Sequence, residues 1–475
     1  NHMVNATLIK ELKKIVGNEY VMHHADELLV FQYDGSTDKA IPDVVVFPKT
    51  ALEISSIITI ANRYDQYIIP RGAGTGLSGG AVPMYGGIQL VLTRMNSILS
   101  IDLENRLALV EPGVVNLDLS KYVAHMGLFY APDPSSQISC TIGGNIAENS
   151  GGPHCLKYGV TTNHVFACEI VTENGEIIWL GDKFRNVPGY DLLSSFVGSE
   201  GMMGIATKII VNLLPIPESV KTHLASFATI EQASFAVSTV ISSGLIPGAI
   251  EMMDKLTIEA VENVVKCGYP DTAGAVLLIE VDGDNEEVNE QSKQIMDICN
   301  NLECQDITVA ASLTERNALW RGRKGALGAL GSLAPNYFLV DGVVPRTKLP
   351  ETLRTIDAIS NKIGLPIANV FHAGDGNLHP CILFDEQKTG MSERVLAAGG
   401  EILQACVDVG GTLTGEHGVG FEKKEFMYKV FSNSDLDQML RLKSAFAPDG
   451  RLNPGKVFPG GPKCFDMGSY NTFTK

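Results

Sequence analysis

The stretch Arg71-Gly72-Ala73-Gly74-Thr75-Gly76-Leu77-Ser78-Gly79-Gly80 decides how the first half of the chain is interpreted. It ends a predicted strand–helix–strand unit, with strands at residues 44–47 and 67–70 and a helix that opens at a Thr50–Glu53 capping box and runs to Arg63. Successive glycines allow consecutive backbone N–H groups to converge on an anion. The stretch is therefore either a phosphate-binding loop or a structural loop.

A Rossmann dinucleotide site is one alternative, because residues 74–79 fit the pattern GxGxxG. That fingerprint requires the loop to open a helix, whose N-terminus receives the pyrophosphate. Here Pro83, Gly86 and Gly87 interrupt the next segment, which continues as the apolar run 88–92. The sequence therefore argues against a Rossmann site.

A second glycine-rich stretch at residues 141–152 is predicted to be another loop of the same kind. Two such loops in one domain favour a large diphosphate cofactor over two chance turns. Apolar runs predict further strands at residues 88–92, 107–110, 169–172, 177–180 and 205–214.

The composition bounds the possible partners. The formal charge is −17, from 37 basic and 54 acidic residues, which argues against nucleic acid because phosphate binding needs clustered cations. An anionic substrate would require local cations or a metal. The nine cysteines are scattered without a CxxC pair, which indicates reduced thiols and no internal iron–sulfur cluster. With no transmembrane segment or signal peptide visible, we expect a cytoplasmic protein.

Beyond Pro217, strands and helices alternate in three units, which predicts an antiparallel sheet backed by helices. Each unit is a helix between two strands. The first has strand 224–228, a helix to 243 and strand 248–252; the second has strand 276–281, helix 286–300 and strand 307–311; the third has strand 337–344, helix 349–363 and strand 367–372. Helices follow at 392–409, interrupted by Gly399-Gly400, and at 434–446.

The three histidines beyond His223 lie in two motifs, Phe371-His372-Ala373-Gly374-Asp375-Gly376-Asn377-Leu378-His379-Pro380 and Gly415-Glu416-His417-Gly418-Val419-Gly420. A two-residue turn at Asp375-Gly376 would set His372 opposite His379 on one face of a hairpin. Two histidines and one carboxylate leave open positions on Zn²⁺ or Fe²⁺, as a catalytic site requires. The competing interpretation is a hydrogen-bonded histidine pair that serves only the structure.

The basic segment Leu319-Trp320-Arg321-Gly322-Arg323-Lys324-Gly325 has two interpretations. Charge clusters are usually the solvated face of a helix. In an acidic protein, the cluster is also a candidate for holding a substrate carboxylate.

Taken together, these motifs resemble the vanillyl-alcohol-oxidase (PCMH-type) flavoproteins, in the branch of D-lactate dehydrogenases, glycolate oxidase subunits and D-2-hydroxyglutarate dehydrogenases. The first glycine loop, Pro132-Asp133-Pro134-Ser135-Ser136, residues 142–152 and Gly198-Ser199-Glu200-Gly201 resemble the FAD-contacting stretches of the family. The two histidine motifs and Asn453-Pro454-Gly455-Lys456 resemble the C-terminal signatures of the branch. The resemblance runs from about Val30 to Pro459.

The resemblance implies an α+β fold, with a two-part FAD-binding domain, an antiparallel cap domain and a C-terminal helical segment that returns to the FAD domain. We place the FAD-binding domain at residues 4–217, the cap at 218–415, the completing segment at 416–460 and a tail at 461–475.

Residue by residue, the resemblance implies one divalent metal on His372, His379 and Glu416. His417 becomes the base, and Arg323, Lys324 and Asn377 hold the substrate. The implied FAD contacts are Arg71, Gly72, Ala73, Gly74, Thr75, Gly76, Leu77, Ser78, Pro132, Ser136, Thr141, Gly144, Asn145, Ser150, Gly151, Ile205 and Asn453.

Two departures from the family refine this picture. Leu327 and Leu339 occupy places where 2-hydroxyglutarate enzymes have residues for a distal carboxylate, which disfavours a dicarboxylate. No histidine lies between His24 and His125, so we expect FAD to be bound non-covalently.

The implied activity is oxidation of D-lactate to pyruvate, with electrons passed to electron-transfer flavoprotein or an iron–sulfur subunit. The alternatives are a glycolate oxidase-type subunit of a larger complex, a non-redox FAD transferase of the same fold, and an interaction-only subunit of a larger oxidase.

Overall fold

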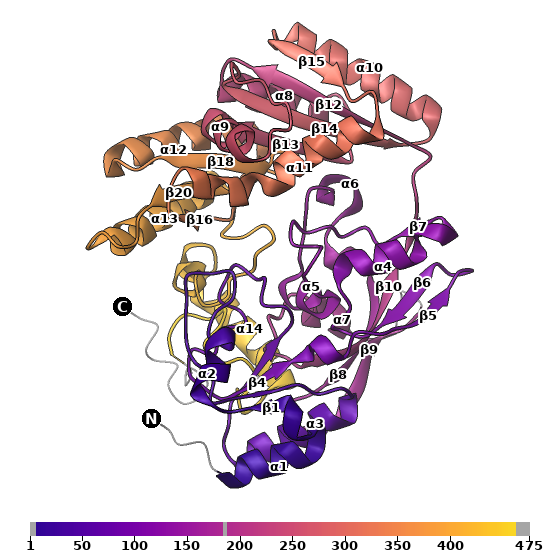
Figure 1. Ribbon diagram of the computed structural model, residues 1–475, viewed down its shortest axis with the longest axis vertical. Coiled ribbons are helices and arrows are strands. Elements are labelled where there is room, and N and C mark those ends of the chain that lie inside the picture. Colours follow the sequence, from indigo (N-terminus) through magenta and orange to yellow (C-terminus); the bar gives the residue numbers. More distant parts are fainter. Residues whose placement is uncertain (1–5, 184–187, 462–475) are drawn as a thin grey trace. The chain divides into compact units, whose positions relative to one another are not determined.

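The computed structural model describes residues 6–183 and 188–461 of the chain. These residues form two compact units, which are labelled by element in Figure 1. The first contains the described parts of residues 1–151, 160–216 and 416–475, and the second contains residues 152–159 and 217–415. Residues 4–5 and 462–475, at the ends of the predicted domains, lie outside the described residues.

The first unit begins with a small sheet in the order β1-β2-β4-β3. The strands are β1 (Val21–Met22), β2 (Val44–Val46), β3 (Ile68–Arg71) and β4 (Ile88–Val91), with helices α1 (Ala6–Val16), α2 (Ala25–Leu28) and α3 (Ala51–Arg63). Strands β2, β4 and β3 are parallel, as the predicted strand–helix–strand unit requires. The predicted capping box of α3 forms only in part: the Thr50 side chain accepts a hydrogen bond from the Glu53 amide, but the Glu53 carboxylate accepts from the Lys49 amide at 2.6 Å.

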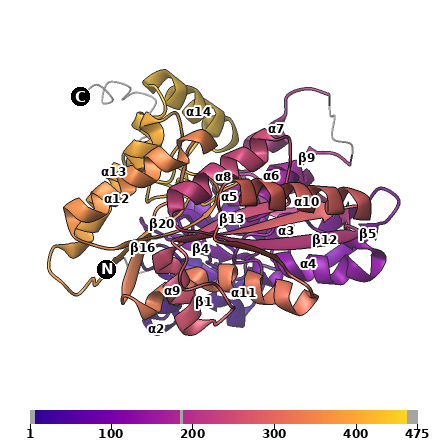
Figure 2. The ribbon, with the colours of Figure 1, turned by 90° about the horizontal axis from the view of Figure 1, so that it is seen from above.

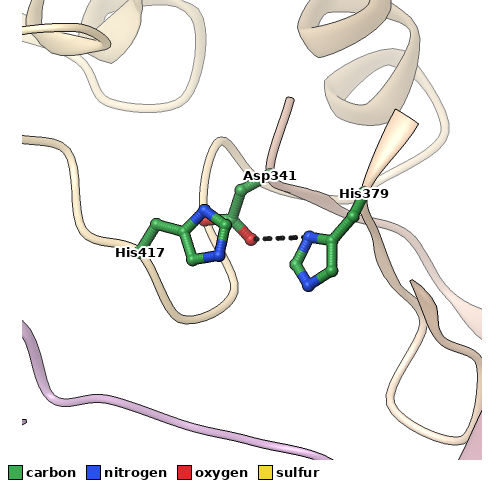
Figure 3. A group of neighbouring side chains, drawn as sticks. All are labelled: Asp341, His379 and His417. Carbon is green, nitrogen blue, oxygen red and sulfur yellow. Dashed lines mark ion pairs between the residues drawn. The ribbon is translucent and has the colours of Figure 1, made fainter. Parts of the chain in front are cut away.

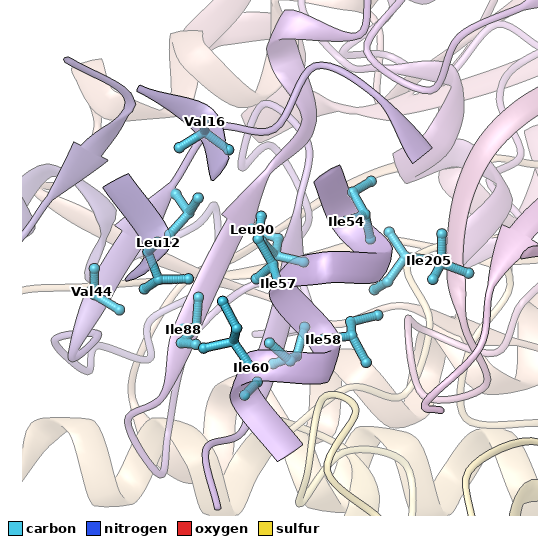
Figure 4. Close-up of a cluster of buried hydrophobic side chains, with 14 of the residues drawn as sticks. Leu12, Val16, Val44, Ile54, Ile57, Ile58, Ile60, Ile88, Leu90 and Ile205 are labelled. Carbon is cyan, nitrogen blue, oxygen red and sulfur yellow. The ribbon is translucent and has the colours of Figure 1, made fainter. Parts of the chain in front are cut away.

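Helix α3 owes its position to an apolar face made of isoleucines. Ile54, Ile57 and Ile58 are fully buried and pack in one cluster with Leu90 of β4 and Ile205. Figure 4 shows these side chains meeting between the helix and the strands. The isoleucines are spaced three or four residues apart, so a helix places them on one face, and burial of that face against the sheet stabilises the helix.

A second sheet of the first unit is antiparallel, in the order β5-β6-β10-β8-β9. Its strands are β5 (Ile98–Asp102), β6 (Leu107–Val110), β8 (Val165–Val171), β9 (Ile177–Gly181) and β10 (Ile205–Asn212). The unit also contains α4 (Asn116–Val123), β7 (Leu128–Phe129), α5 (Ile142–Glu148), α7 (Leu192–Phe196), β11 (Leu214–Pro215) and α14 (Asn433–Phe446).

The prediction of a second glycine-rich loop was wrong for its first half. Thr141 caps helix α5, and its side chain accepts a hydrogen bond from the Gly144 amide. Gly143 lies in the first turn, where a Cβ would come within 2.6 Å of Pro112. These glycines therefore allow close packing of a helix instead of making a loop.

The second unit is built on one large antiparallel sheet, in the order β15-β12-β14-β13-β18, extended beyond β18 by β19 with β17 and by β20 with β16. The strands are β12 (Ser219–Phe227), β13 (Ala249–Asp254), β14 (Ala275–Gly283), β15 (Asp306–Val309), β16 (Asn336–Leu339), β17 (Gly342–Val343), β18 (Ile367–His372), β19 (Asn377–Leu378) and β20 (Pro380–Phe384). This confirms the predicted α+β class.

Helices cover both faces of this sheet. They are α8 (Ile230–Ser242), α9 (Lys255–Val264), α10 (Asn285–Asn301), α11 (Leu313–Ala329), α12 (Leu349–Ile363) and α13 (Met391–Asp408), with the short α6 (Cys155–Tyr158). In Figure 2, α8 and α10 lie on one side of β12, and α9 and α11 lie on the other. Side chains of α9 and α11 share one buried cluster with Met253 of β13 and Val370 of β18.

Two predictions in the second unit need correction. The strand predicted at 337–344 is two strands, because β16 pairs with β20 whereas β17 pairs with β19, and the chain changes partner around Asp341. Helix α13 is not interrupted at its glycines, since Gly399 allows Phe338 to pack where a Cβ would come within 2.5 Å.

The predicted return of the C-terminal segment to the first unit is confirmed. Leu452 forms a parallel bridge with Ile68 of β3, and the Asn453 amide donates to the Ile68 carbonyl at 2.8 Å. Among the described helices, none combines the length and apolar character that crossing a membrane requires.

Candidate active site

The glycine loop after β3 lies against the N-terminus of α5. A Cβ on Gly72 would come within 2.4 Å of the Thr141 hydroxyl, so the two predicted FAD-contacting stretches meet at this point. The Ser78 hydroxyl is buried and has no hydrogen-bond partner among the described residues. An unpaired buried hydroxyl is costly, so a ligand that bonds to Ser78 would stabilise the loop.

The Arg71 guanidinium folds back beneath this loop. Its Nη1 donates to the Tyr33 carbonyl at 2.7 Å, and burial lowers its pKa. A Cβ on Gly74 would come within 2.1 Å of this guanidinium, so the loop closes over it. Arg71 therefore supports the loop from within the first unit.

Asn116 connects three of the residues predicted to contact FAD, although the sequence did not single it out. Its amide donates to the Pro132 carbonyl and to the Asn145 side chain, both at 3.0 Å. The Asn145 amide in turn lies 3.4 Å from the Ser150 hydroxyl. The structure thus joins Pro132, Asn145 and Ser150 through Asn116, a residue that no pattern in the sequence singles out.

Asn453 joins two of the predicted FAD-contacting loops. Its side-chain amide donates to the Gly80 carbonyl at 2.9 Å and to the Glu200 carbonyl at 2.7 Å. Its Oδ1 is buried and has no hydrogen-bond partner in the described part of the chain. Nearby, the Lys456 ammonium donates to the Gly79 carbonyl at 2.5 Å, and burial lowers its pKa to about 8.

The remaining predicted FAD contacts lie in the same unit with different exposure. Ile205 packs its side chain in the apolar core. Gly151 is buried, and Ala73 is exposed. The half-buried residues are Thr75, Gly76, Leu77, Ser136 and Gly144.

The hairpin of the second unit differs from the predicted one. His372 pairs with Asn377, so the turn contains residues 373–376 instead of Asp375 and Gly376 alone. The register that pairs Asn369 with Pro380 places His379 opposite Val370. His372 and His379 are therefore diagonal neighbours on one face.

The two histidines still meet, as predicted, by this different route. Their ring centroids lie 5.1 Å apart with the rings nearly perpendicular. Each offers a ring nitrogen, and these nitrogens lie within 4.8 Å of one another. One cation with ligand bonds of about 2.0–2.1 Å could bind both.

His372 and Arg323 share a buried carboxylate that the sequence analysis missed. Glu251 of β13 lies opposite His372 of β18, with its oxygens 2.8 and 2.9 Å from His372 Nδ1. The Arg323 Nε lies 2.6 Å from Glu251 Oε2. Burial opposes ionisation of Glu251, but Arg323 and His372 hold the pKa of its carboxyl below the usual value.

Asp341 is a second buried carboxylate beside the histidines. Its Oδ1 lies 3.9 Å from His379 Nδ1, and Figure 3 marks this ion pair with a dashed line. Asp341 also accepts hydrogen bonds from the Thr414 hydroxyl at 2.5 Å and from the Gly415 amide at 3.1 Å. It thereby fixes the chain immediately before Glu416.

Glu416 and His417 follow Gly415 directly, as the first residues of the segment assigned to the first unit. Both are half-buried, and His417 Nε2 lies 3.7 Å from Glu416 Oε1. Glu200 accepts hydrogen bonds from the Val419 and Gly420 amides at 2.7 and 2.6 Å, so a buried carboxylate holds the loop after His417.

The other predicted substrate residues differ in their surroundings. Lys324 is exposed, with its ammonium 5.8 Å from the Trp320 ring centroid. Asn377 is buried, and its Oδ1 has no hydrogen-bond partner among the described residues. Gly415 packs on Asn377 so closely that a Cβ would come within 2.3 Å of its amide.

These residues fit the groups that the sequence implies. The glycine loop, with Ser78 and Asn453 offering unpaired buried atoms, is chemically suited to a diphosphate cofactor. Two imidazoles with nearby carboxylates form a donor set that suits Zn²⁺ or Fe²⁺.

Two family models match the chain: a FAD binding domain over residues 42–181 and the C-terminal domain of FAD linked oxidases over residues 216–457. The chain is 44% identical to glycolate oxidase subunit GlcD of Escherichia coli (strain K12) over 464 residues, covering 98% of this chain and 93% of that protein. It is 31% identical to D-lactate dehydrogenase of Anaerostipes hadrus over 449 residues, covering 93% of each.

Solved structures show the fold. P-cresol methylhydroxylase with substrate bound is similar with a TM-score of 0.80 at 17% identity, covering 95% of this chain and 96% of that chain. The 4-ethylphenol oxidase of Gulosibacter chungangensis has a TM-score of 0.79 at 19% identity, covering 96% of this chain and 98% of that chain. The predicted PCMH-type fold is thereby confirmed.

Proposed function

Because the chain belongs to the family of FAD-linked oxidases that includes glycolate oxidase subunits and D-lactate dehydrogenases, we propose that it oxidises a small 2-hydroxy acid to the 2-oxo acid. The observation that carries this proposal is the buried group of Arg323, Glu251 and His372 beside His379. This group combines Arg323, which can bind the carboxylate of a substrate, with His372 and His379, which can bind a metal. A 2-hydroxy acid presents the matching carboxylate and hydroxyl.

His372, His379 and Glu416 would hold one divalent metal, and Asp341 would offer a further carboxylate oxygen beside His379. Bound at such a site, a divalent cation supplies Lewis acidity toward the substrate hydroxyl, and FAD supplies the hydride acceptor. Glu416 and His417 directly follow Gly415 in the chain, and the Gly415 amide donates a hydrogen bond to Asp341.

The residues of the chain would then perform three tasks. Arg323 binds the substrate carboxylate through its terminal amino groups, and Asn377 offers an unpaired amide oxygen. His417 takes the proton of the substrate hydroxyl. Glu200 holds the backbone just after His417, which fixes the direction of that base.

D-lactate is the substrate that we infer from the sequence, and glycolate is the second candidate. The 44% identity to a glycolate oxidase subunit favours glycolate, which differs from lactate only by lacking the methyl group. Half-buried Leu327 and Leu339 offer no charge to a distal carboxylate, which supports a monocarboxylate.

The reduced flavin needs an electron acceptor outside this chain, since the scattered cysteines offer no cluster. We expect a protein carrier, either electron-transfer flavoprotein or an iron–sulfur subunit. Rapid peroxide production that matches turnover of the isolated chain would instead indicate a plain oxidase.

Anaerobic titration with D-lactate, L-lactate, glycolate and D-2-hydroxyglutarate tests the proposed function directly. We expect bleaching of the flavin band by D-lactate or glycolate and little response to the dicarboxylate. If no 2-hydroxy acid bleaches the flavin, the proposal is wrong, and a non-redox transferase of the same fold becomes the better candidate.

A further inference from the structure

Glu251 is a fully buried carboxylate whose two partners are both predicted site residues. We propose that Glu251 is the positioning residue of the site, holding His372 ready to ligate a metal and Arg323 ready to bind the substrate carboxylate. This inference rests on the proposed function and assigns a role to a residue that does not itself touch the substrate.

The first step is the geometry of the strand pair. Glu251 and His372 are directly opposed on antiparallel strands β13 and β18, so their side chains leave the same face of the sheet. Arg323 reaches that face from helix α11, and its Nε lies 2.6 Å from Glu251. One carboxylate thus meets an imidazole from a strand and a guanidinium from a helix.

The second step concerns the tautomer of His372. Both oxygens of Glu251 lie within 2.9 Å of Nδ1, and a carboxylate only accepts hydrogen bonds, so Nδ1 carries the proton. Nε2 is then the unprotonated nitrogen, the form in which an imidazole ligates a metal. A carboxylate behind a ligating histidine fixes its tautomer and raises its basicity in just this way.

The third step concerns Arg323. Because Nδ1 of His372 already donates to Glu251, it does not accept from Arg323 Nη2, which lies 3.4 Å away. Glu251 forms an ion pair with Arg323 at Nε, 2.6 Å away, although this N–H makes no hydrogen bond among the described residues. This ion pair uses neither terminal amino group, and these groups face the proposed substrate. The buried pair is neutral overall, so Arg323 supplies geometry, and a metal must supply the net positive charge that a substrate anion needs.

A structural ion pair is the competing explanation, and the same sheet provides a matched example. Glu280 of β14 accepts from Arg316 of the same helix α11 at 2.9 and 2.7 Å, and lies 3.1 Å from a histidine, His154. Leu278 of β14 is paired with Glu251 of β13, and Glu280 lies two residues beyond Leu278 on the same strand. The carboxylates of Glu251 and Glu280 therefore lie on the same face of the sheet. The Glu280 group includes neither of the paired histidines.

Glu251→Gln tests the proposal sharply. The amide oxygen is expected to face Arg323, which can only donate, and this puts the amide NH₂ at the position of Oε1, 2.8 Å from His372 Nδ1. His372 must then accept at Nδ1 and carry its proton on Nε2, which blocks the metal ligand. We expect the affinity for Zn²⁺ or Co²⁺, measured by equilibrium dialysis, to fall about 10- to 100-fold with FAD content unchanged.

Glu280→Gln is the matched control, because it weakens a buried pair of the same kind without touching a candidate ligand. Its metal affinity should equal that of the wild type. Glu251→Asp keeps the charge with a shorter reach and should recover part of the affinity. Raising the metal concentration should restore hydroxy-acid-driven flavin reduction in Glu251→Gln, which a purely structural defect would not allow.

The outcomes are distinguishable. A wild-type protein that binds no stoichiometric metal overturns the metal site and this inference together. A wild type that binds metal, with Glu251→Gln and Glu280→Gln binding it equally well, overturns this inference alone. Should Glu251→Gln fail to fold, Glu251→Asp with wild-type metal affinity and wild-type KM for the hydroxy acid would overturn the inference just as firmly.

Discussion

Replacing Arg323 by Ala is expected to lower kcat/KM for the hydroxy acid by about 30- to 900-fold. This range corresponds to about 2–4 kcal/mol, the cost of truncating one partner of a buried charge pair, at about 1.36 kcal/mol per tenfold. The structure supports a value of this size because the side chains of Arg323 and Glu251 are only 3% and 0% exposed. The assay is stopped-flow reduction of the flavin by D-lactate and glycolate.

The same substitution leaves Glu251 buried without its cation, so stability should fall by about 3–5 kcal/mol. Arg323→Lys separates the two effects. Lysine keeps a positive charge near Glu251 but lacks the planar fork that binds a carboxylate at two points. We expect Arg323→Lys to recover most of the thermal stability and still to lose at least about tenfold in kcat/KM.

Arg316→Lys is the control, since Arg316 lies on the same helix and pairs with Glu280 instead. It should change thermal stability but leave kcat/KM and FAD content at wild-type values. Unaltered kcat/KM in folded, FAD-loaded Arg323→Ala and Arg323→Lys would show that Arg323 does not bind the substrate and is only a structural partner of Glu251.

Three further predictions follow from other parts of the structure. Burial opposes ionisation of Glu280, but His154 and Arg316 hold the pKa of its carboxyl well below the usual value. The stability that ionised Glu280 contributes is therefore present above the unfolded pKa of about 4.3 and lost as pH falls. In Glu280→Gln, the free energy of unfolding, followed by circular dichroism, should fall less steeply as the pH is lowered. Lys456→Met removes the ammonium that holds the Gly79 carbonyl, and should weaken FAD retention during gel filtration without changing metal content. Acid precipitation should release yellow flavin into the supernatant, and colour that stays in the pellet would show a covalent link.

Local patterns in the sequence predicted much of the fold. The Thr50 cap and the isoleucine face of α3 depend on residues three or four apart, and both are present. The reciprocal half of the predicted capping box is not seen, because Glu53 accepts from the Lys49 amide instead. The bounds of α12 and β18 were predicted to the residue. These features depend on residues close together in the sequence, so the spacing of apolar residues predicts them directly.

Other features depend on contacts that no local pattern encodes. Glu251 precedes its partner His372 by 121 positions, and a single glutamate in an apolar strand gives no sign of which strand will face it. Asp341 owes its role to a change of strand partner, and residues 152–159 join the second unit although most of the surrounding sequence belongs to the first.

Predictions based on glycines were wrong in two places for the same physical reason. Near Gly143 and Gly399 the pattern predicted a loop and a break, because glycine weakens a helix. In both helices the missing Cβ allows a neighbour, Pro112 or Phe338, to approach closely. The two-residue turn failed similarly: Asp375-Gly376 does lie in the turn, but the register is set by the strands and pairs His372 with Asn377.

Anaerobic flavin reduction before and after removal of metal tests the proposed metal-assisted oxidation most directly. D-lactate or glycolate should bleach the flavin of the untreated protein, and a chelator should abolish bleaching while leaving the oxidised FAD spectrum intact. Adding Zn²⁺, Fe²⁺, Mn²⁺ or Co²⁺ should restore it, and His379→Ala should resist restoration, whereas His417→Ala should bind the metal yet reduce the flavin about 10²–10⁴-fold more slowly. Metal-free protein whose flavin is bleached at the untreated rate would contradict a role for the metal in the oxidation.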